Sequence, residues 1–194
     1  MRNFRRVVVP FTLLLVTITA MAQEATSPGD EAQVLKLTLP TQPLMDLIEQ
    51  VEKKSGKSFL IASHVPAEVV TGTTNLKDLD YAALLAILQN NGFGAVSVGE
   101  FTNIVPLSAI RMYDLPLLHE DDASVAQLEW VTRIVRLQHA SAKELVPVVR
   151  PLLIQAGHIA AIQQSNSILI VERYSNAKRI AEILQTLDKM APEG

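Results

Sequence analysis

The chain has 194 residues, of which 48% are hydrophobic and 19% charged, and its formal net charge at pH 7 is −3. It contains no cysteine, which excludes disulfides, thiolate metal sites and a lipid-modified N-terminal cysteine. The acidic balance makes nucleic acid an unsuitable partner, because a phosphate backbone requires clustered cations.

The N-terminus predicts a secretory signal peptide in residues 1–22. Arg2, Arg5 and Arg6 precede an apolar run that ends in Ala20-Met21-Ala22, a cleavage site of the A-x-A type. The run is about 14 residues long, short of the roughly 20 that span a bilayer. Cleavage leaves 14 Lys plus Arg against 20 acidic residues, a formal charge of −6. We therefore expect an exported, periplasmic protein without a membrane span.

After a disordered lead at 23–33, residues 34–106 predict a first small domain of strands and amphipathic helices. Thr41 and Asp80 are the expected helix N-caps, and Gly56 the stop of the first helix. The expected elements are a half-buried strand at 34–39, a helix with the stripe Leu44, Leu47, Ile48 and Val51, strands at 58–61 and 69–74, a helix with the stripe Tyr81, Leu84, Leu85 and Leu88, and a hairpin of 95–98 and 101–105.

We predict a linker at residues 107–129, a second domain at 130–189 and a tail at 190–194. In the second domain, Ser141 and Glu144 form an expected capping box, Ser175 an expected cap, and Pro147 an expected kink. The expected elements are a strand at 130–137, a helix with the stripe Leu145, Val148, Val149 and Leu152, strands at 158–162 and 168–171, and a helix with the stripe Ile180, Ile183, Leu184 and Leu187. The predicted fold class is α+β: two small domains in tandem, each a short sheet packed by two helices.

The order of the two units and several of their sequence segments resemble the secretins, the outer-membrane proteins of type II secretion and type IV pilus systems. The segments that carry the resemblance include Leu44-Met45-Asp46-Leu47-Ile48, Gly56-Lys57-Ser58-Phe59-Leu60-Ile61, Ile104-Val105-Pro106, Val135-Arg136-Leu137-Gln138-His139-Ala140 and Ser165-Asn166-Ser167-Ile168-Leu169-Ile170. The resemblance implies a first and a second secretin N-domain, the second of KH-like βαββα type, and does not extend to the secretin barrel. The chain is either a stand-alone relative or a fragment of a longer secretin.

Catalytic and metal-binding chemistry has little support in the sequence. Only one of the four histidines, His119, lies beside acidic residues, namely Glu120, Asp121 and Asp122, which form either a metal site or a solvated acidic linker. There is no G-x-S-x-G, phosphate-binding glycine loop or H-E-x-x-H motif. No G-x-x-G loop accompanies the KH-like pattern, so we expect no nucleic-acid binding. We predict a protein that is not an enzyme and has no cofactor.

Binding is the remaining function, and sheet edges are the candidate sites, since they carry unpaired N–H and C=O groups. The alternative is that these edges are covered within the domain. Trp130, the single tryptophan, is a candidate anchor between the domains or for a partner, or else a packed core residue. The candidate edge residues are Val34, Lys36 and Thr38 on the first strand and Val69, Val70, Thr71 and Thr73 on the third.

The leading hypothesis is a non-enzymatic periplasmic interaction module that contributes to protein secretion or pilus machinery. The resemblance implies secretion-system partners, namely a secretin, an inner-membrane protein or further copies of this chain. The alternative is a sensor or ligand-binding module, because the first unit also resembles the signalling domain of TonB-dependent receptors. Those receptors do not normally carry the second unit.

Overall fold

The computed structural model describes residues 39–72, 76 and 79–191, which all belong to one compact unit. The predicted signal peptide and lead lie outside the described residues. So does the predicted strand at 34–39, apart from Leu39. Within the described part of the chain, no helix is long and apolar enough to cross a membrane.

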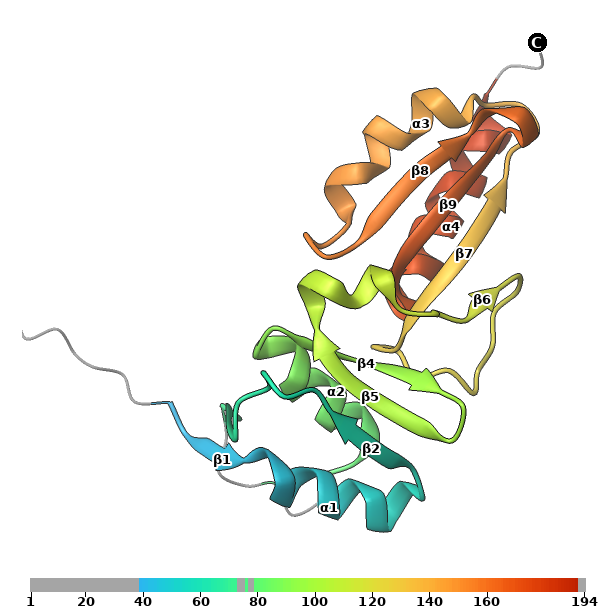
Figure 1. The fold of residues 1–194 in the computed structure, drawn as a ribbon. Helices are drawn as coiled ribbons and strands as arrows, with labels where there is room; N and C mark the ends of the chain where they lie inside the picture. Colours follow the sequence, from blue (N-terminus) through green and yellow to red (C-terminus); the bar gives the residue numbers. More distant parts are fainter. Residues whose placement is uncertain (1–38, 73–75, 77–78, 192–194) are drawn as a thin grey trace, which may run out of the picture. The chain divides into compact units, whose positions relative to one another are not determined.

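The first half of the fold contains two sheets rather than one (Figure 1). β1 (Thr41–Pro43) and β3 (Glu68–Val70) form an antiparallel two-stranded sheet. β2 (Ser58–Ile61) and β4 (Phe93–Val98) flank β5 (Phe101–Pro106) in a second sheet, where β2 runs parallel to β5 and β4 antiparallel. The predicted hairpin is confirmed: β4 and β5 are its strands, and Gly99 in its turn has a positive φ of 60°.

The two helices of this half bury the predicted stripes, except that Tyr81 of the second stripe is half-buried. α1 (Leu44–Ser55) buries all four predicted apolar residues and ends at Gly56, whose N–H bonds to the carbonyl of Glu52 in a left-handed conformation. α2 (Tyr81–Asn90) begins with the predicted cap, because the Asp80 carboxylate accepts the Ala83 N–H at 2.8 Å. Helix periodicity therefore predicted both helices, and the local signals at Gly56 and Asp80 predicted the end of α1 and the start of α2.

The predicted cap at Thr41 is wrong. Pro43 occupies the N-cap position and makes no side-chain cap bond. Thr41 lies instead in β1, opposite Val70, and its hydroxyl donates to Glu68 Oε2 at 3.1 Å. The physical reason is that the Leu44 N–H at the helix start donates to the carbonyl of Ala67, which is 23 residues away in sequence.

The second half has one four-stranded sheet in the order β6-β7-β9-β8 (Figure 1). β7 (Trp130–Arg136) and β8 (His158–Ile162) each pair antiparallel with β9 (Ser167–Arg173), as the predicted βαββα pattern requires. The short β6 (Leu117–Leu118) comes from the predicted linker and adds parallel to β7. The α+β class is thus confirmed.

Two helices pack against this sheet, α3 (Ala142–Val149) and α4 (Tyr174–Met190). α4 buries Ile180 and Leu184 of its predicted stripe, with Ile183 and Leu187 half-buried. In α3 the predicted stripe is partly wrong, because Val148 and Leu152 are exposed. The buried face of α3 is Ala142, Val146 and Val149. Both sets of residues have helical spacing, so spacing alone did not determine which face of α3 joins the core of the second half.

The side chains predicted to cap these two helices, Ser141 and Ser175, do not cap them. Ser141 has the N-cap conformation but makes no side-chain cap bond. The amide oxygen of Asn166 accepts the Ala142 N–H instead, at 2.9 Å. Ser175 lies inside α4, and its N–H donates to the backbone carbonyl of Gln127. Groups distant in sequence therefore satisfy the orphan N–H groups of both helix starts.

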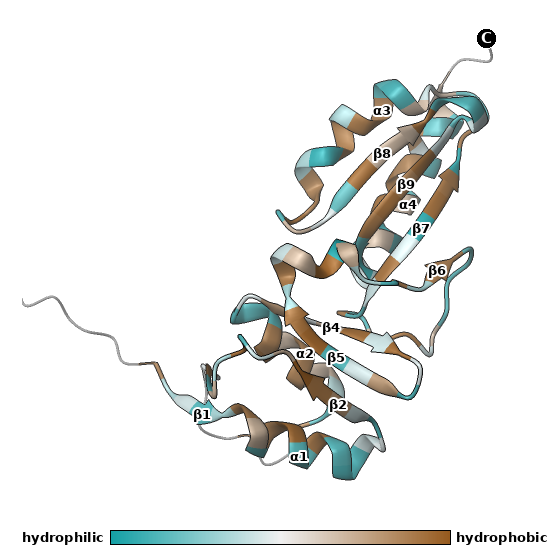
Figure 2. Cartoon of the chain, in the orientation of Figure 1, coloured by the Kyte–Doolittle hydropathy of each residue, from teal (hydrophilic) through white to brown (hydrophobic). Residues whose placement is uncertain are grey.

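Three apolar clusters form the interior of the described chain. One lies between the first-half helices and the β2-β5-β4 sheet, and one between α3, α4 and the larger sheet. Figure 2 shows the corresponding pattern, with hydrophobic colour concentrated along the central strands and hydrophilic colour on the exposed helix faces. The third cluster joins residues of both halves: Val96, Val105, Ile110, Trp130 and Val171.

Candidate functional site

The predicted docking edge on the third strand coincides with the small β1–β3 sheet. Val69 is buried in the first core, whereas Val70, which is 37% exposed, lies on the opposite face. Thr71 donates its N–H to the carbonyl of Pro40. Val34, Lys36, Thr38 and Thr73 lie outside the described residues. The role of these residues in partner binding stays a prediction.

The outer edge of β3 is occupied by a side chain that the sequence reasoning missed. The Asn91 amide oxygen accepts the Val70 N–H at 2.9 Å, and its nitrogen donates to the Val70 carbonyl at 2.8 Å. Asn91 follows α2 directly, so one amide both terminates that helix and pairs with the strand edge as a further strand would. The Asn-Asn-Gly helix end was the only sequence signal for this contact.

The outer edge of β1 has a different character. Pro40 and Leu44 bond across to β3, so the pleat turns the backbone groups of Thr41 and Pro43 away from it. Proline has no N–H, which leaves the N–H and carbonyl of Thr41 and the carbonyl of Pro43 on this edge. The exposed face beside it carries Val70 and Glu68. We call Thr41, Pro43, Glu68 and Val70 the β1–β3 surface.

Trp130 lies at the start of β7 and is 2% exposed. It belongs to the third apolar cluster together with Val96 of β4 and Val171 of β9. Gly94 lies beside it, and a Cβ on Gly94 would collide with Ile110 and lie 3.2 Å from Trp130 Nε1. The side chain therefore packs against both the first-half sheet and the second-half sheet.

Glu129, next to Trp130, bonds to both halves through different atoms. Its carboxylate accepts the Tyr81 hydroxyl of α2 at 2.8 Å, and its backbone carbonyl accepts the Tyr174 N–H at the start of α4 at 2.7 Å. Lys57 lies 4.6 Å from the centre of the Tyr81 ring, a cation–π contact. Burial, followed by the Glu129 charge, raises the pKa of Tyr81 far above its ordinary value. The tyrosine therefore stays protonated and donates.

The acidic residues of the linker pair with cations of the second half. Asp121 bonds Lys178 of α4 at 2.8 Å and Arg133 of β7 at 2.6 Å, and these two bonds lower its pKa. The Asp122 N–H donates to the Tyr174 hydroxyl at 2.9 Å. Among the described residues, which include His119, no group of three or more His, Asp or Glu side chains is arranged to hold a metal ion.

The fold and these surfaces define a class: small α+β domains that expose short strand edges. Comparison with known proteins narrows this class. Residues 132–193 match the family model of the bacterial type II/III secretion system short domain. Residues 132–193 are therefore similar to a secretin N-domain, a resemblance that the sequence predicted.

Individual relatives agree with this assignment. The chain is 26% identical over 192 residues to the secretin XcpQ of Pseudomonas aeruginosa, covering 93% of this chain and 28% of that protein. It is 29% identical over 150 residues to the secretin GspD 2 of Escherichia coli O78:H11, covering 75% of this chain and 22% of that protein. The chain thus spans about a quarter of the length of these relatives.

A solved structure supports the fold. The type II secretion system outer membrane complex of Klebsiella pneumoniae, with PulD, PulS and the PulC HR domain, contains a chain that matches with a TM-score of 0.61 at 22% identity. The match covers 78% of this chain and 26% of that one.

Proposed function

We propose that this chain is a periplasmic, non-enzymatic interaction module of a type II secretion system, and that the β1–β3 surface binds a protein partner. The observation that carries the proposal is the outer edge of β1, where Thr41 turns its backbone groups outward beside the exposed Val70. Such an edge accepts a strand from a partner through main-chain bonds, and neighbouring side chains add specificity.

Relatedness supports the choice of partner. The structure from Klebsiella pneumoniae contains the PulC HR domain, so the partner we propose here is a domain of that kind. The short domain at 132–193 favours a secretion component over a receptor signalling module. The same relatedness and the predicted signal peptide support the periplasmic location that we propose.

Binding of the purified protein to a recombinant PulC HR domain, measured by isothermal titration calorimetry, tests the proposal. Val70→Asp places a charge on the exposed face beside the edge and should weaken binding at least tenfold, about 1.4 kcal/mol. The matched control is Val148→Asp, because Val148 on α3 is 60% exposed and far from β1 in the fold. Equal affinity of both variants would refute the assigned surface, and absence of binding to the HR domain would refute the assigned partner.

A further inference from the structure

Two adjoining cavities lie between the short helix η1 (Leu107–Met112) and the loop at 153–158 that leads into β8. The larger, of about 540 Å³, has apolar walls from Leu107, Ile154 and Ala156, together with Gln89 and Ser108. The smaller, of about 310 Å³, is lined by Arg150 and His158. Arg111, Ile154 and Gln155 line both cavities, which therefore share a wall. We call the pair the η1 cleft.

The η1 cleft is cationic although the chain as a whole is acidic. Arg111, Arg150 and His158 line the smaller cavity, and the described residues that line either cavity include no Asp or Glu. One N–H of Arg150 donates to the carbonyl of Ile159 at 3.3 Å. A guanidinium carries five N–H donors, so most of the donors of both arginines have no acceptor within the described part of the chain.

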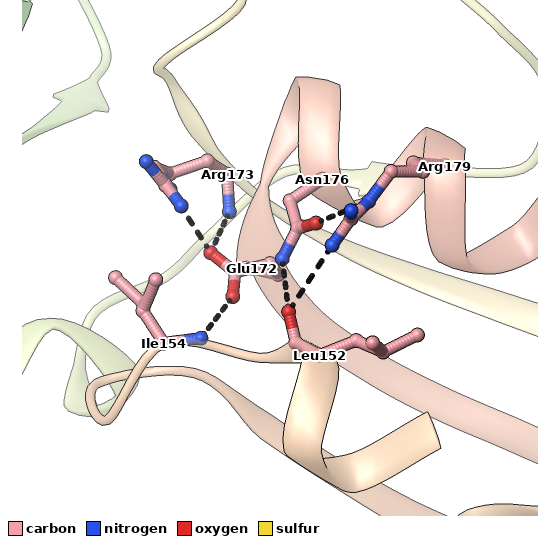
Figure 3. Close-up of polar contacts among 6 residues, drawn as sticks. All are labelled: Leu152, Ile154, Glu172, Arg173, Asn176 and Arg179. Carbon is pink, nitrogen blue, oxygen red and sulfur yellow. Dashed lines mark hydrogen bonds and ion pairs between the residues drawn. The ribbon is translucent and has the colours of Figure 1, made fainter. Parts of the chain in front are cut away.

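The wall of the cleft is held in place by a buried carboxylate (Figure 3). Glu172 of β9 is 0% exposed, and its Oε2 accepts the Ile154 N–H at 3.0 Å. Its Oε1 accepts both the backbone N–H and the Nε–H of Arg173. A side chain at Gly157 would collide with this carboxylate, because a Cβ there would lie 2.9 Å from Oε2. Glu172 thus contacts the loop at both Ile154 and Gly157.

A second anchor holds the start of the same loop. The Leu152 carbonyl accepts the Asn176 Nδ2–H at 3.1 Å and the Arg179 Nη2–H at 3.4 Å, both from α4. Figure 3 shows these two side chains converging on that carbonyl. Binding to a wall that is already ordered costs little conformational entropy, so the cleft is preorganised for a ligand.

We propose that the η1 cleft binds an extended acidic segment of a protein partner, with a carboxylate between Arg111 and Arg150 and a neighbouring apolar side chain in the larger cavity. A guanidinium matches a carboxylate with two parallel bonds. The adjoining apolar walls of Leu107 and Ile154 favour a peptide, whose acidic and apolar side chains alternate, over an inorganic anion. This site is separate from the β1–β3 surface and does not depend on the function proposed for it.

Fluorescence anisotropy with the purified protein and a labelled peptide, acetyl-Leu-Glu-Leu-Glu-Leu-amide, tests the inference. We expect saturable binding that added salt weakens and that Arg111→Gln and Arg150→Gln each weaken about tenfold, since each removes charge-assisted bonds. Arg136→Gln is the matched control, because Arg136 is an exposed arginine of β7 outside the cleft. It should leave the affinity unchanged.

Three outcomes would overturn the assignment. Equal affinity for a peptide with Gln in place of Glu would show that the carboxylates do not contribute to binding. Equal loss in Arg136→Gln would show attraction to the general charge of the protein rather than a site. Displacement of the peptide by an equal concentration of inorganic phosphate would assign the cleft to a small anion instead of a peptide.

Discussion

Asp188 near the end of α4 is a buried charge whose removal should destabilise the second half. It is 8% exposed, and its two carboxylate oxygens accept the backbone N–H groups of Gln138, His139 and Ala140 at 2.8 to 3.1 Å. These three residues connect β7 to α3. One side chain therefore fixes the path of the chain between the sheet and its first helix.

Asp188→Asn keeps the shape of the side chain and removes its charge and one acceptor oxygen. A hydrogen bond to a charged group contributes about 1.5 to 3 kcal/mol, and a neutral one about 1. Three N–H donors are affected, and one of them would face the amide NH₂ of the new asparagine. The free energy of unfolding should therefore fall by about 2 to 3 kcal/mol. With a urea m-value of about 2 kcal/mol/M, the unfolding midpoint should fall by about 1 M.

The loss should depend on pH in a defined direction. Burial alone raises the pKa of Asp188, but the N–H donors of Gln138, Ala140 and His139 outweigh burial, and the pKa in the folded protein lies below the ordinary 3.8. A carboxyl group with a lowered folded pKa stabilises fully above its unfolded pKa, and the stabilisation is lost as the pH falls through the folded pKa. The difference between wild type and Asp188→Asn should therefore be constant from about pH 5 to 7 and shrink below about pH 4.

Urea unfolding monitored by far-UV circular dichroism and by the fluorescence of Trp130 measures both effects. Asp114→Asn is the control, since Asp114 is an exposed linker residue that accepts no hydrogen bond from the described residues. The reasoning fails if the two variants unfold at the same urea concentration. It also fails if the stability gap of Asp188→Asn persists unchanged at about pH 2.5, well below the ordinary pKa of an aspartate.

Three further substitutions test other contacts by urea unfolding monitored by far-UV circular dichroism alone, because one of them removes the single tryptophan. Trp130→Ala should cost about 3 to 5 kcal/mol, because it empties a site packed by both halves; a cost below about 1 kcal/mol would contradict that packing. Asn166→Gly should cost about 2 kcal/mol despite relieving a positive φ of 45°, since the amide bonds of Asn166 to Ala142, Leu137 and Ala140 are lost; an unchanged midpoint would show that the backbone conformation matters more. Tyr81→Phe removes the bond to the Glu129 carboxylate and the hydrogen bond with the Thr102 side chain, and should cost about 1 to 2 kcal/mol, with a larger effect counting against simple hydrogen bonds.

The regular elements were predictable because their signals are local. The stripe of α1, the Asp80 cap and the glycine that ends α1 each act over three or four residues, and all are present as expected. The turn that predicted the β4–β5 hairpin is equally local. Together with the family resemblance, these signals determined the α+β class and the βαββα order of the second half.

Contacts between residues distant in sequence decided the rest. Asn166 and the carbonyl of Gln127 replaced the predicted caps, because a nearer acceptor in space satisfies a helix N–H as well as one nearby in sequence. Asn91 pairs with the β3 edge in the same way. The η1 cleft brings Arg111 and Arg150 together from different elements, and no spacing in the sequence indicates this. Sequence by itself determined which segments form helices and strands, and only the tertiary structure decided which edges and charges remain available to a partner, because availability depends on what folds against each group.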